Sequence, residues 1–246
     1  MTSPWWRRLE RAAEVTALTA MVLTPLGDRG GRWRRGLTGV IVGAGAIRSI
    51  AADVRVHGVR RGLTVGAAAV TTTWIAEVVG LRTGRPFGRY HYTTALRPQL
   101  AGVPVHVPLA WSAMAAPAHS AGAAMAPNSG PVPRLVAGAS ALTAWDVFLD
   151  PQMTAEGYWE WARGGGFRGV PLSNFAGWLV VSAAVMALRE LVLESGRPDR
   201  AHELTYGVVA VMQVAAFATF LRDRGVAVAG ATAMLTPVVV ALTVRR

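Results

Sequence analysis

Long apolar runs, separated by shorter polar segments, make up most of the chain. Each run approaches the roughly 20 residues that an α-helix needs to cross the hydrocarbon core of a bilayer. The pattern therefore predicts an all-α fold, a polytopic transmembrane helical bundle. The runs are Arg11–Leu26, Gly36–Ala52, Gly62–Gly80, Leu100–Met125, Val132–Asp150, Leu172–Glu194, Glu203–Leu221 and Val226–Val244. Since the first two runs are short and carry Glu14 and Arg48, we expect seven or eight spans.

The most polar segments lie at Leu81–Gln99, Pro151–Pro171 and Ser195–His202. The first two are rich in Gly and aromatic residues, a composition that favours re-entrant or interfacial structure over a flexible linker. The sequence contains no internal repeat and no second soluble domain. We expect one integral-membrane domain over residues 1–246, with its motifs concentrated in a core at about residues 74–178.

Composition and charge agree with a membrane location. Hydrophobic residues make up 52% of the chain, and the mean hydropathy is +0.34. The formal net charge is +11, and all 25 basic residues are arginines, most of them between the apolar runs. Arginines in that position anchor a protein at the membrane surface and contact anionic lipid. We therefore expect an integral protein of a bacterial cell membrane, with membrane lipid as a partner and no nucleic acid.

Residues that hold metals or redox cofactors are scarce. The absence of cysteine excludes disulfides, iron–sulfur clusters and thiolate-ligated haem. The five histidines form no HxxxH or HxxHH cluster of the kind that di-iron membrane hydroxylases need. Val40–Arg48 resembles a dinucleotide fingerprint but lacks its third glycine, so we interpret Gly39 and Gly43 as helix-packing residues. We expect no metal and no cofactor.

Ionisable residues inside the apolar runs are costly to bury and therefore informative. Five of them are expected to have structural roles, in ion pairs or near helix ends: Glu14, Arg48, Arg189, Glu190 and Glu194. Three others are candidate catalytic residues: Glu77, Asp146 and Asp150. Glu77 lies nearly a full span into its run, where a functional and a structural role are equally good interpretations.

Asp146 and Asp150 are four residues apart, so on a helix they share a face. Two close carboxylates in a low-dielectric site do not both ionise easily, and one of them is expected to hold a proton. Pro151 predicts that the helix ends at Asp150, where an aspartate before proline is a common N-cap of a following helix. Asp146 has no such role, which makes it the better candidate for a neutral acid.

Aromatic residues crowd around the aspartate pair. An interfacial belt explains many membrane tryptophans and tyrosines, but rings also stabilise a carbocation through their quadrupole. Tyr158 and Asn174 supply groups that can hold water. His91 lies between two tyrosines in a Gly-rich loop, where a surface imidazole is an equally good interpretation. The candidate substrate-binding residues are Tyr90, His91, Trp111, Trp145, Tyr158, Trp159, Trp161, Asn174 and Trp178.

Two segments in the middle of the chain carry a resemblance. They are EVVGLRTGRPFGRYHYTTALRPQLAGVPVHVPLAW (Glu77–Trp111) and the motifs AWDVFLDPQM, WEW and GVPLSNFAGW between Ala144 and Trp178. This part is similar to the carotenoid-biosynthesis membrane protein family of the carotenoid 1,2-hydratase type, whereas the N-terminal third and the last two runs match in hydropathy alone. The resemblance implies that water is added across the terminal 1,2 (1′,2′) double bond of an acyclic carotenoid, without oxygen or a redox cofactor. Other carotenoid-pathway membrane enzymes are conceivable partners.

Hydration of this kind would require both the acidic and the aromatic residues. An isolated trisubstituted alkene is a weak base, so it needs a strong acid, a shielded tertiary cation and one positioned water. We predict Asp146 as the general acid, and Asp150 or Glu77 as its partner or as the base toward water. Nearby tryptophans then form the walls for the cation and the polyene.

Two other functions fit parts of the pattern. DVFLD has the DxxxD spacing with which intramembrane prenyltransferases hold magnesium and diphosphate, although those enzymes need two such motifs and the chain has one. A non-enzymatic carotenoid carrier or a small transporter is compatible with broken helices near the Gly-rich segments Leu81–Gln99 and Gly164–Gly169.

Overall fold

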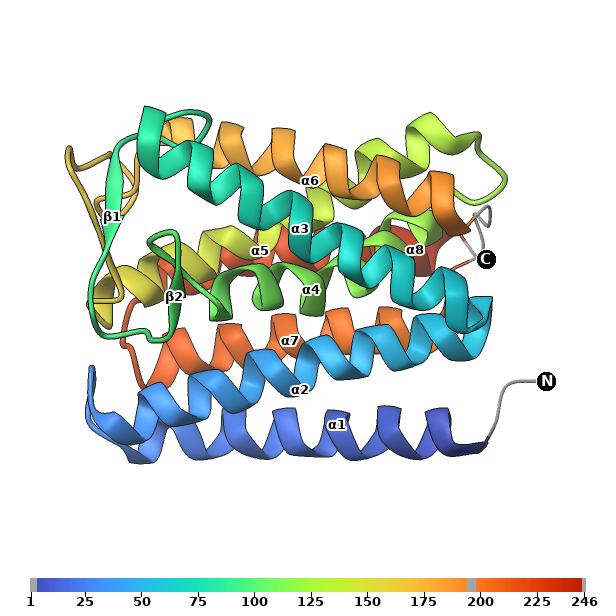
Figure 1. Ribbon diagram of the computed structural model, residues 1–246, viewed down its shortest axis with the longest axis horizontal. Coiled ribbons are helices and arrows are strands. Elements are labelled where there is room, and N and C mark those ends of the chain that lie inside the picture. The colour runs from blue at the N-terminus through green and yellow to red at the C-terminus, as the bar shows by residue number, and fades with distance from the viewer. Residues whose placement is uncertain (1–3, 194–197, 245–246) are drawn as a thin grey trace.

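The computed structural model describes residues 4–193 and 198–244. These residues form eight α-helices that run along the long axis of the molecule (Figure 1). The helices are α1 (Pro4–Leu23), α2 (Arg32–His57), α3 (Val59–Thr83), α4 (His106–Met125), α5 (Pro131–Ala155), α6 (Leu172–Leu193), α7 (Arg200–Thr219) and α8 (Arg224–Val244). The shorter elements are the 3-10 helix η1 (Thr24–Leu26) and the strands β1 (Tyr90–Tyr92), β2 (Gln99–Leu100), β3 (Val103–Pro104) and β4 (Trp159–Trp161).

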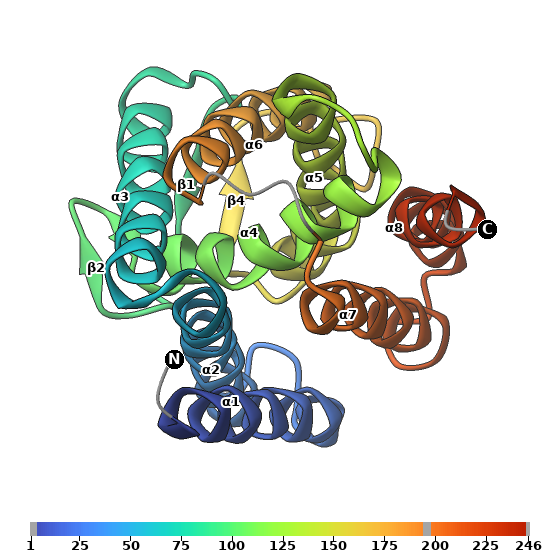
Figure 2. The same cartoon turned by 90° about the vertical axis from the view of Figure 1, so that its right-hand side faces the viewer.

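Helix α4 occupies the middle of the bundle and contacts α2, α3, α5 and α7 (Figure 2). Every residue from Met114 to Ala124 is buried. Small residues allow this close packing: a side chain at Gly122 would collide with the backbone of Gly138 on α5. Because α4 meets protein on most sides, it does not need the strongly apolar surface of a helix that faces lipid.

Six of the described helices, α2, α3, α5, α6, α7 and α8, are long and apolar enough to cross a membrane. Helices α1 and α4 have the length as well but are not among the six. Large hydrophobic side chains such as Leu179, Val211 and Val239 are exposed on the outside of the bundle, as contact with lipid requires. The predicted all-α polytopic bundle of an integral membrane protein is confirmed.

Each predicted apolar run contains most of one helix, but the run Leu100–Met125 begins with residues of β2 and β3 before α4. Helix α2 extends beyond Gly36–Ala52 at both ends. Near its start, Arg34 forms a buried ion pair with Glu156. Near its end, Arg55 lies 2.7 Å from Glu10 of α1. A charge that is paired and hydrogen-bonded is tolerated inside a packed bundle. Helix α2 therefore includes charged residues at both ends, although hydropathy alone predicted a shorter helix.

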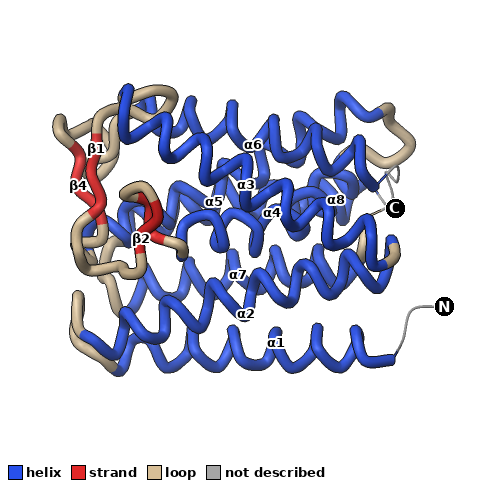
Figure 3. The backbone as a smooth tube through the Cα atoms, viewed as in Figure 1, coloured by secondary structure: helices blue, strands red, loops and turns tan. Residues whose placement is uncertain are grey.

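The two long polar segments meet at one end of the bundle, where β1 and β4 pair in antiparallel fashion (Figure 3). Tyr90 stands opposite Trp161, and Tyr92 stands opposite Trp159. Alternate residues of a strand face opposite sides, so these four rings share the face that looks onto the helices. We call Tyr90, Tyr92, Trp159 and Trp161 the aromatic cover. The two long polar segments are therefore ordered structure at one end of the bundle and not flexible linkers, as their composition indicated.

Two local predictions are wrong. Helix α5 does not end at Asp150 but continues through Pro151 to Ala155. Proline removes one backbone hydrogen-bond donor. Because Pro151 lies close to the end of the helix, the loss of that hydrogen bond has a small effect. Asp150 is consequently no N-cap, and its carboxylate serves elsewhere. Gly43 is not a packing residue either, since nothing lies within 4 Å of the position that a side chain there would occupy.

Ion pairs join the helices at the end opposite the aromatic cover. Arg189 of α6 donates two hydrogen bonds of 2.9 Å to Asp53 of α2. Arg48 of α2 lies 3.7 Å from Glu14 of α1, and it donates to the carbonyl oxygen of Ala201 on α7 at 2.8 Å. The structural roles expected for Arg48, Arg189 and Glu14 are confirmed.

Glu190 of α6 belongs to the same class of structural ion pairs. Its carboxylate lies 2.7 Å from Arg134 of α5 and 2.8 Å from the ring of His119 on α4. The structural role expected for Glu190 is therefore confirmed, whereas Glu194 lies outside the described residues.

Candidate functional site

Three acidic side chains are buried beneath the aromatic cover. Glu77 is near the end of α3, while Asp146 and Asp150 face the same way from the last turns of α5. Their exposed fractions are 5%, 0% and 2%. The structure thus brings together all three acids that the sequence singled out as catalytic candidates.

Asn174, in the first turn of α6, bridges the two aspartates. Its amide nitrogen donates one hydrogen bond to Oδ2 of Asp146 at 2.6 Å and a second to Oδ2 of Asp150. The indole N–H of Trp159 donates to the other oxygen of Asp150 at 2.6 Å. Both oxygens of Asp150 therefore accept N–H groups. By contrast, Oδ1 of Asp146 is buried without a partner in the described part of the chain.

Glu77 is held by two phenols of the aromatic cover. Its Oε2 accepts hydrogen bonds from the hydroxyl groups of Tyr90 and Tyr92, the latter at 2.8 Å. Gly80 makes room for this approach, because a side chain there would collide with the ring of Phe87 and the hydroxyl of Tyr90. Burial, and then the nearby Glu77 carboxylate, raise the pKa of both phenols. Both tyrosines therefore remain protonated donors at neutral pH.

In the part of the chain that the structure describes, no positive side chain balances the charge of the three acids. Their hydrogen-bond donors are an amide, an indole and two phenols, all neutral. Within residues 4–193 and 198–244, none of the three forms an ion pair with Arg or His. Burying an unpaired carboxylate costs several kcal/mol. Protons must therefore supply much of the missing positive charge, and the site is suited to holding acidic protons inside the membrane.

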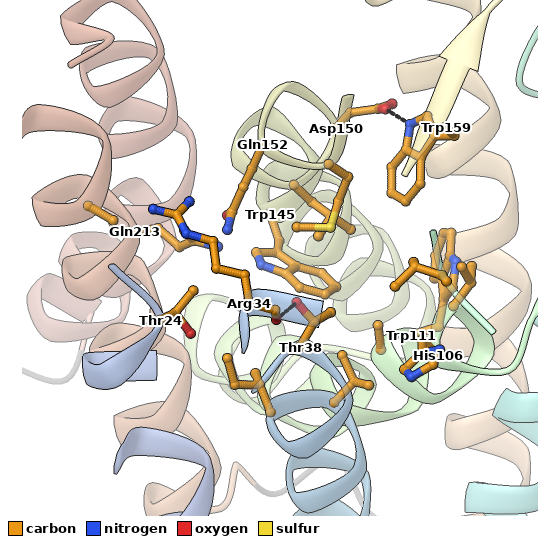
Figure 4. Close-up of a pocket in the computed structure, with 18 of the residues that line it drawn as sticks. Thr24, Arg34, Thr38, His106, Trp111, Trp145, Asp150, Gln152, Trp159 and Gln213 are labelled. Atoms are coloured by element: carbon orange, nitrogen blue, oxygen red, sulfur yellow. Dashed lines mark hydrogen bonds between the residues drawn. The ribbon is translucent and has the colours of Figure 1, made fainter. Parts of the chain in front are cut away.

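A cavity of about 180 Å³ adjoins the acids (Figure 4). Glu77, Asp150 and Asn174 line its wall, whereas Asp146 lies behind them and does not. A cavity of this size has room for more than one water molecule, since one water needs roughly 10–15 Å³. An acid on this wall can therefore meet both a hydrocarbon and a water.

Tryptophan rings form much of the remaining wall. Trp111 of α4 stacks on Trp178 of α6, with ring centroids 3.8 Å apart. Trp145 of α5 meets Trp178 edge-on at 6.1 Å. Ring faces attract positive charge, so this wall suits a cation that forms next to it.

Residues 36–245 match the family described as carotenoid biosynthesis protein. The chain belongs to this family. The match begins at residue 36 and reaches through α7 and α8. It therefore corrects the expectation that the N-terminal third and the last two runs resemble the family in hydropathy alone, except for the residues before 36.

One curated relative of this carotenoid biosynthesis protein has a more specific description than the family. The chain is 32% identical over 115 residues to the bisanhydrobacterioruberin hydratase of Haloarcula japonica. That similarity covers 46% of this chain and only 39% of the relative's length. No solved structure matches the chain.

Most of the predicted binding residues of this carotenoid biosynthesis protein line the cavity: Tyr90, Trp111, Trp145, Trp159, Trp161, Asn174 and Trp178. His91 does not, because strand alternation turns it to the outer face, where 65% of its side chain is exposed and Glu160 lies 3.5 Å away. Tyr158 is buried but lies off the cavity, with its hydroxyl 3.4 Å from that of Thr38. The structure does not support the binding roles predicted for His91 and Tyr158.

Several residues that line the cavity of this carotenoid biosynthesis protein were not predicted from the sequence. Tyr92 was one, although the alternation in Tyr-His-Tyr would have placed it beside Tyr90 on an inward face. Met212 and Gln213 of α7 were others. They come from an apolar run with no motif, so only the packing of α7 reveals them.

Proposed function

We propose that this protein hydrates the terminal 1,2 double bond of an acyclic carotenoid to give a tertiary alcohol. The relative from Haloarcula japonica is named a hydratase, and the family is one of carotenoid biosynthesis. One observation carries the proposal: three buried acids, held only by neutral donors, adjoin a ring-lined cavity. A site that merely binds a hydrocarbon has no use for such acids.

Glu77 is the acid in this proposal. It lines the cavity, and both phenols donate to its Oε2, so we assign the proton that reaches the substrate to its other oxygen. That proton moves to C2 of the alkene, which leaves the tertiary cation at C1. Direct transfer needs contact, so Asp146, which does not line the cavity, suits the step less well than the sequence indicated.

The stacked tryptophans shield the cation. Trp111 and Trp178 present a continuous aromatic wall, with Trp145 beside them. A ring within reach of a desolvated cation stabilises it by about 2 kcal/mol or more. The wall also excludes bulk water, so that one positioned water captures the cation.

Asp150 is the base toward that water. Two N–H donors, from Trp159 and Asn174, stabilise its ionised form. As the water oxygen bonds to C1, a proton passes from the water to Asp150. Glu77 has then lost one proton and Asp150 has gained one, and transfer through cavity water restores both before the next turnover. Asp146 holds the bridge of Asn174 in place.

The geometry weighs against the prenyltransferase alternative. Magnesium is bound through oxygen lone pairs, but N–H groups of Asn174 and Trp159 already point at the oxygens of Asp150. In the described ranges, no group of three or more His, Cys, Asp or Glu residues is placed to hold a metal ion.

Expression in a host that makes lycopene or a C50 carotenoid tests the proposal. We expect products heavier by one water per hydrated end, measured by mass spectrometry. Pigment that is bound but unchanged after prolonged incubation would indicate a carrier. Product formation that depends on magnesium and releases diphosphate would indicate a prenyltransferase.

A further inference from the structure

The cavity continues from the acids to the edge of the bundle between α2 and α7. Figure 4 shows Trp111 and Asp150 on one side of it and Gln213 on the other. The lining at this far side is mostly apolar. From α1, α2, α7 and the turn after α7 it includes Met21, Ile41, Val42, Met212, Ala216 and Phe220.

Within the described residues, the hydrogen bonds between α2 and α7 lie near one end of the two helices. There, Arg48 of α2 hydrogen-bonds to the ring of His202 at 2.6 Å and to the carbonyl of Ala201 at 2.8 Å. Away from that end, no hydrogen bond joins α2 to α7 in the part of the chain that the structure describes, and both helices pack on α4 (Figure 2). The residues that line the cavity lie in this separated part, and Ile41, Met212 and Ala216 are each partly exposed.

We propose that this opening is a lateral portal for the polyene arm of the carotenoid. The end group lies at the acids, and the conjugated chain passes between Ile41 of α2 and Met212 and Ala216 of α7 into the surrounding hydrocarbon. The inference rests on the proposed function and adds the route by which the substrate enters and leaves.

The size of the cavity requires such an exit. At about 180 Å³, it is smaller than the roughly 300–1,000 Å³ that enclose a drug-sized ligand, and a carotenoid is longer still. The other end is closed by the aromatic cover and by the stacked rings of Trp111 and Trp178. The chain must therefore leave where the lining is open.

The lining at the portal suits a hydrocarbon. Met21 and Met212 both line the cavity, and methionine adapts its shape to an apolar partner. The charged residue of this lining, Arg34, is paired with Glu156 and donates to the carbonyl of Gly27 at 2.8 Å. Its charge is thus already satisfied and does not repel a polyene.

A matched pair of substitutions tests the portal. Ala216→Trp fills it, whereas Ala215→Trp adds the same ring at an exposed neighbour that does not line the cavity. We expect Ala216→Trp to lower retained lycopene and hydration of lycopene about tenfold, because overpacking excludes the chain. A short acyclic isoprenoid with the same terminal unit should react at near the parent rate. Ala215→Trp should leave both substrates unaffected.

Each outcome decides the inference. Lycopene retention and hydration at parent levels in Ala216→Trp would overturn the portal. Equal loss of both substrates, in Ala216→Trp and in the milder Ala216→Leu, would place the effect on the site itself and also overturn it. If the parent protein hydrates neither substrate, the proposed function fails. Lycopene retention by purified protein then decides the portal alone: lower retention in Ala216→Trp than in Ala215→Trp supports it, and equal retention overturns it.

Discussion

The indole N–H of Trp159 donates to Oδ1 of Asp150 at 2.6 Å. A strand of the aromatic cover thereby fixes the orientation of a carboxylate on helix α5. The contact also connects the two polar segments to the acids, because β4 pairs with β1, whose tyrosines hold Glu77. Cover and acids therefore form one hydrogen-bonded unit.

Trp159→Phe should keep the ring but remove the donor. A charged acceptor left unsatisfied loses about 1.5–3 kcal/mol, so we expect hydration to fall about 10- to 100-fold with lycopene retention unchanged. Trp33→Phe is the control, because it removes an exposed indole N–H that donates to Leu23 at 3.3 Å, and neither residue lines the cavity. Equal activities of the two variants would show that this donor does not matter.

Glu77→Gln tests the proposed acid. Glutamine keeps the shape and still accepts the phenols, but it has no acidic proton to give to the alkene. Loss of a general acid typically lowers the rate about 10²–10⁴-fold, and we expect that range with pigment binding intact. Glu160→Gln, on the exposed outer face of β4, should behave as the parent. A fully active Glu77→Gln would move the acid role to the aspartate pair.

Asp146→Asn separates the two assignments of the acid. If Asp146 is neutral and only holds the bridge of Asn174, asparagine can replace it, and we expect less than about a tenfold loss in rate. The general-acid role that the sequence indicated requires about a 10²–10⁴-fold loss instead. Rates should be compared in preparations with equal amounts of folded protein. A purely structural Asp146 could instead have paired with Arg48, but Arg48 contacts Glu14 and His202.

The hydroxyl oxygen of the product should come from water. The proposed steps use a proton from Glu77 and a water molecule, and oxygen gas takes no part in them. Incubation in oxygen-18 water should therefore shift the product mass, as seen by mass spectrometry. A label that enters from oxygen-18 gas would contradict the mechanism.

Asp53→Ala should destabilise the bundle without touching the site. Removal of the Asp53 carboxylate leaves Arg189 buried without the two hydrogen bonds of 2.9 Å that it donates. Breaking a buried ion pair lowers the stability of the fold by about 3–5 kcal/mol. We expect a clear fall in melting temperature in detergent. Arg168→Ala removes the exposed partner of Asp223 and leaves that carboxylate to accept from the backbone N–H of Val226, so it should change the melting temperature little. Similar melting temperatures for the two variants would refute the structural role of the Asp53 pair.

Hydropathy was sufficient for the helices because lipid demands long apolar runs. It failed at boundaries where charges are paired, as at Arg34 and Arg55 of α2. It also could not show that α4 is central, because an alanine-rich helix looks similar whether it meets lipid or protein. Pairing and packing between distant segments are decided by the tertiary structure.

The acids of the site were predictable because charge inside a span is rare. Their order of importance was not, since only the structure shows that Glu77 and Asp150 line the cavity and Asp146 does not. Strand periodicity alone would have turned His91 outward. Met212 carries no signal in the sequence, because its role depends on how α7 packs against its neighbours.

A cavity that is blind at the acids and open at one edge has a consequence for substrates with two reactive ends. The rigid polyene cannot turn round while its arm is threaded between α2 and α7. Under the proposed function, the second end is reached only after the singly hydrated molecule has left, reversed in the bilayer and returned. The reaction is then distributive rather than processive, and the half-modified carotenoid is a released compound that another enzyme of the same membrane can intercept.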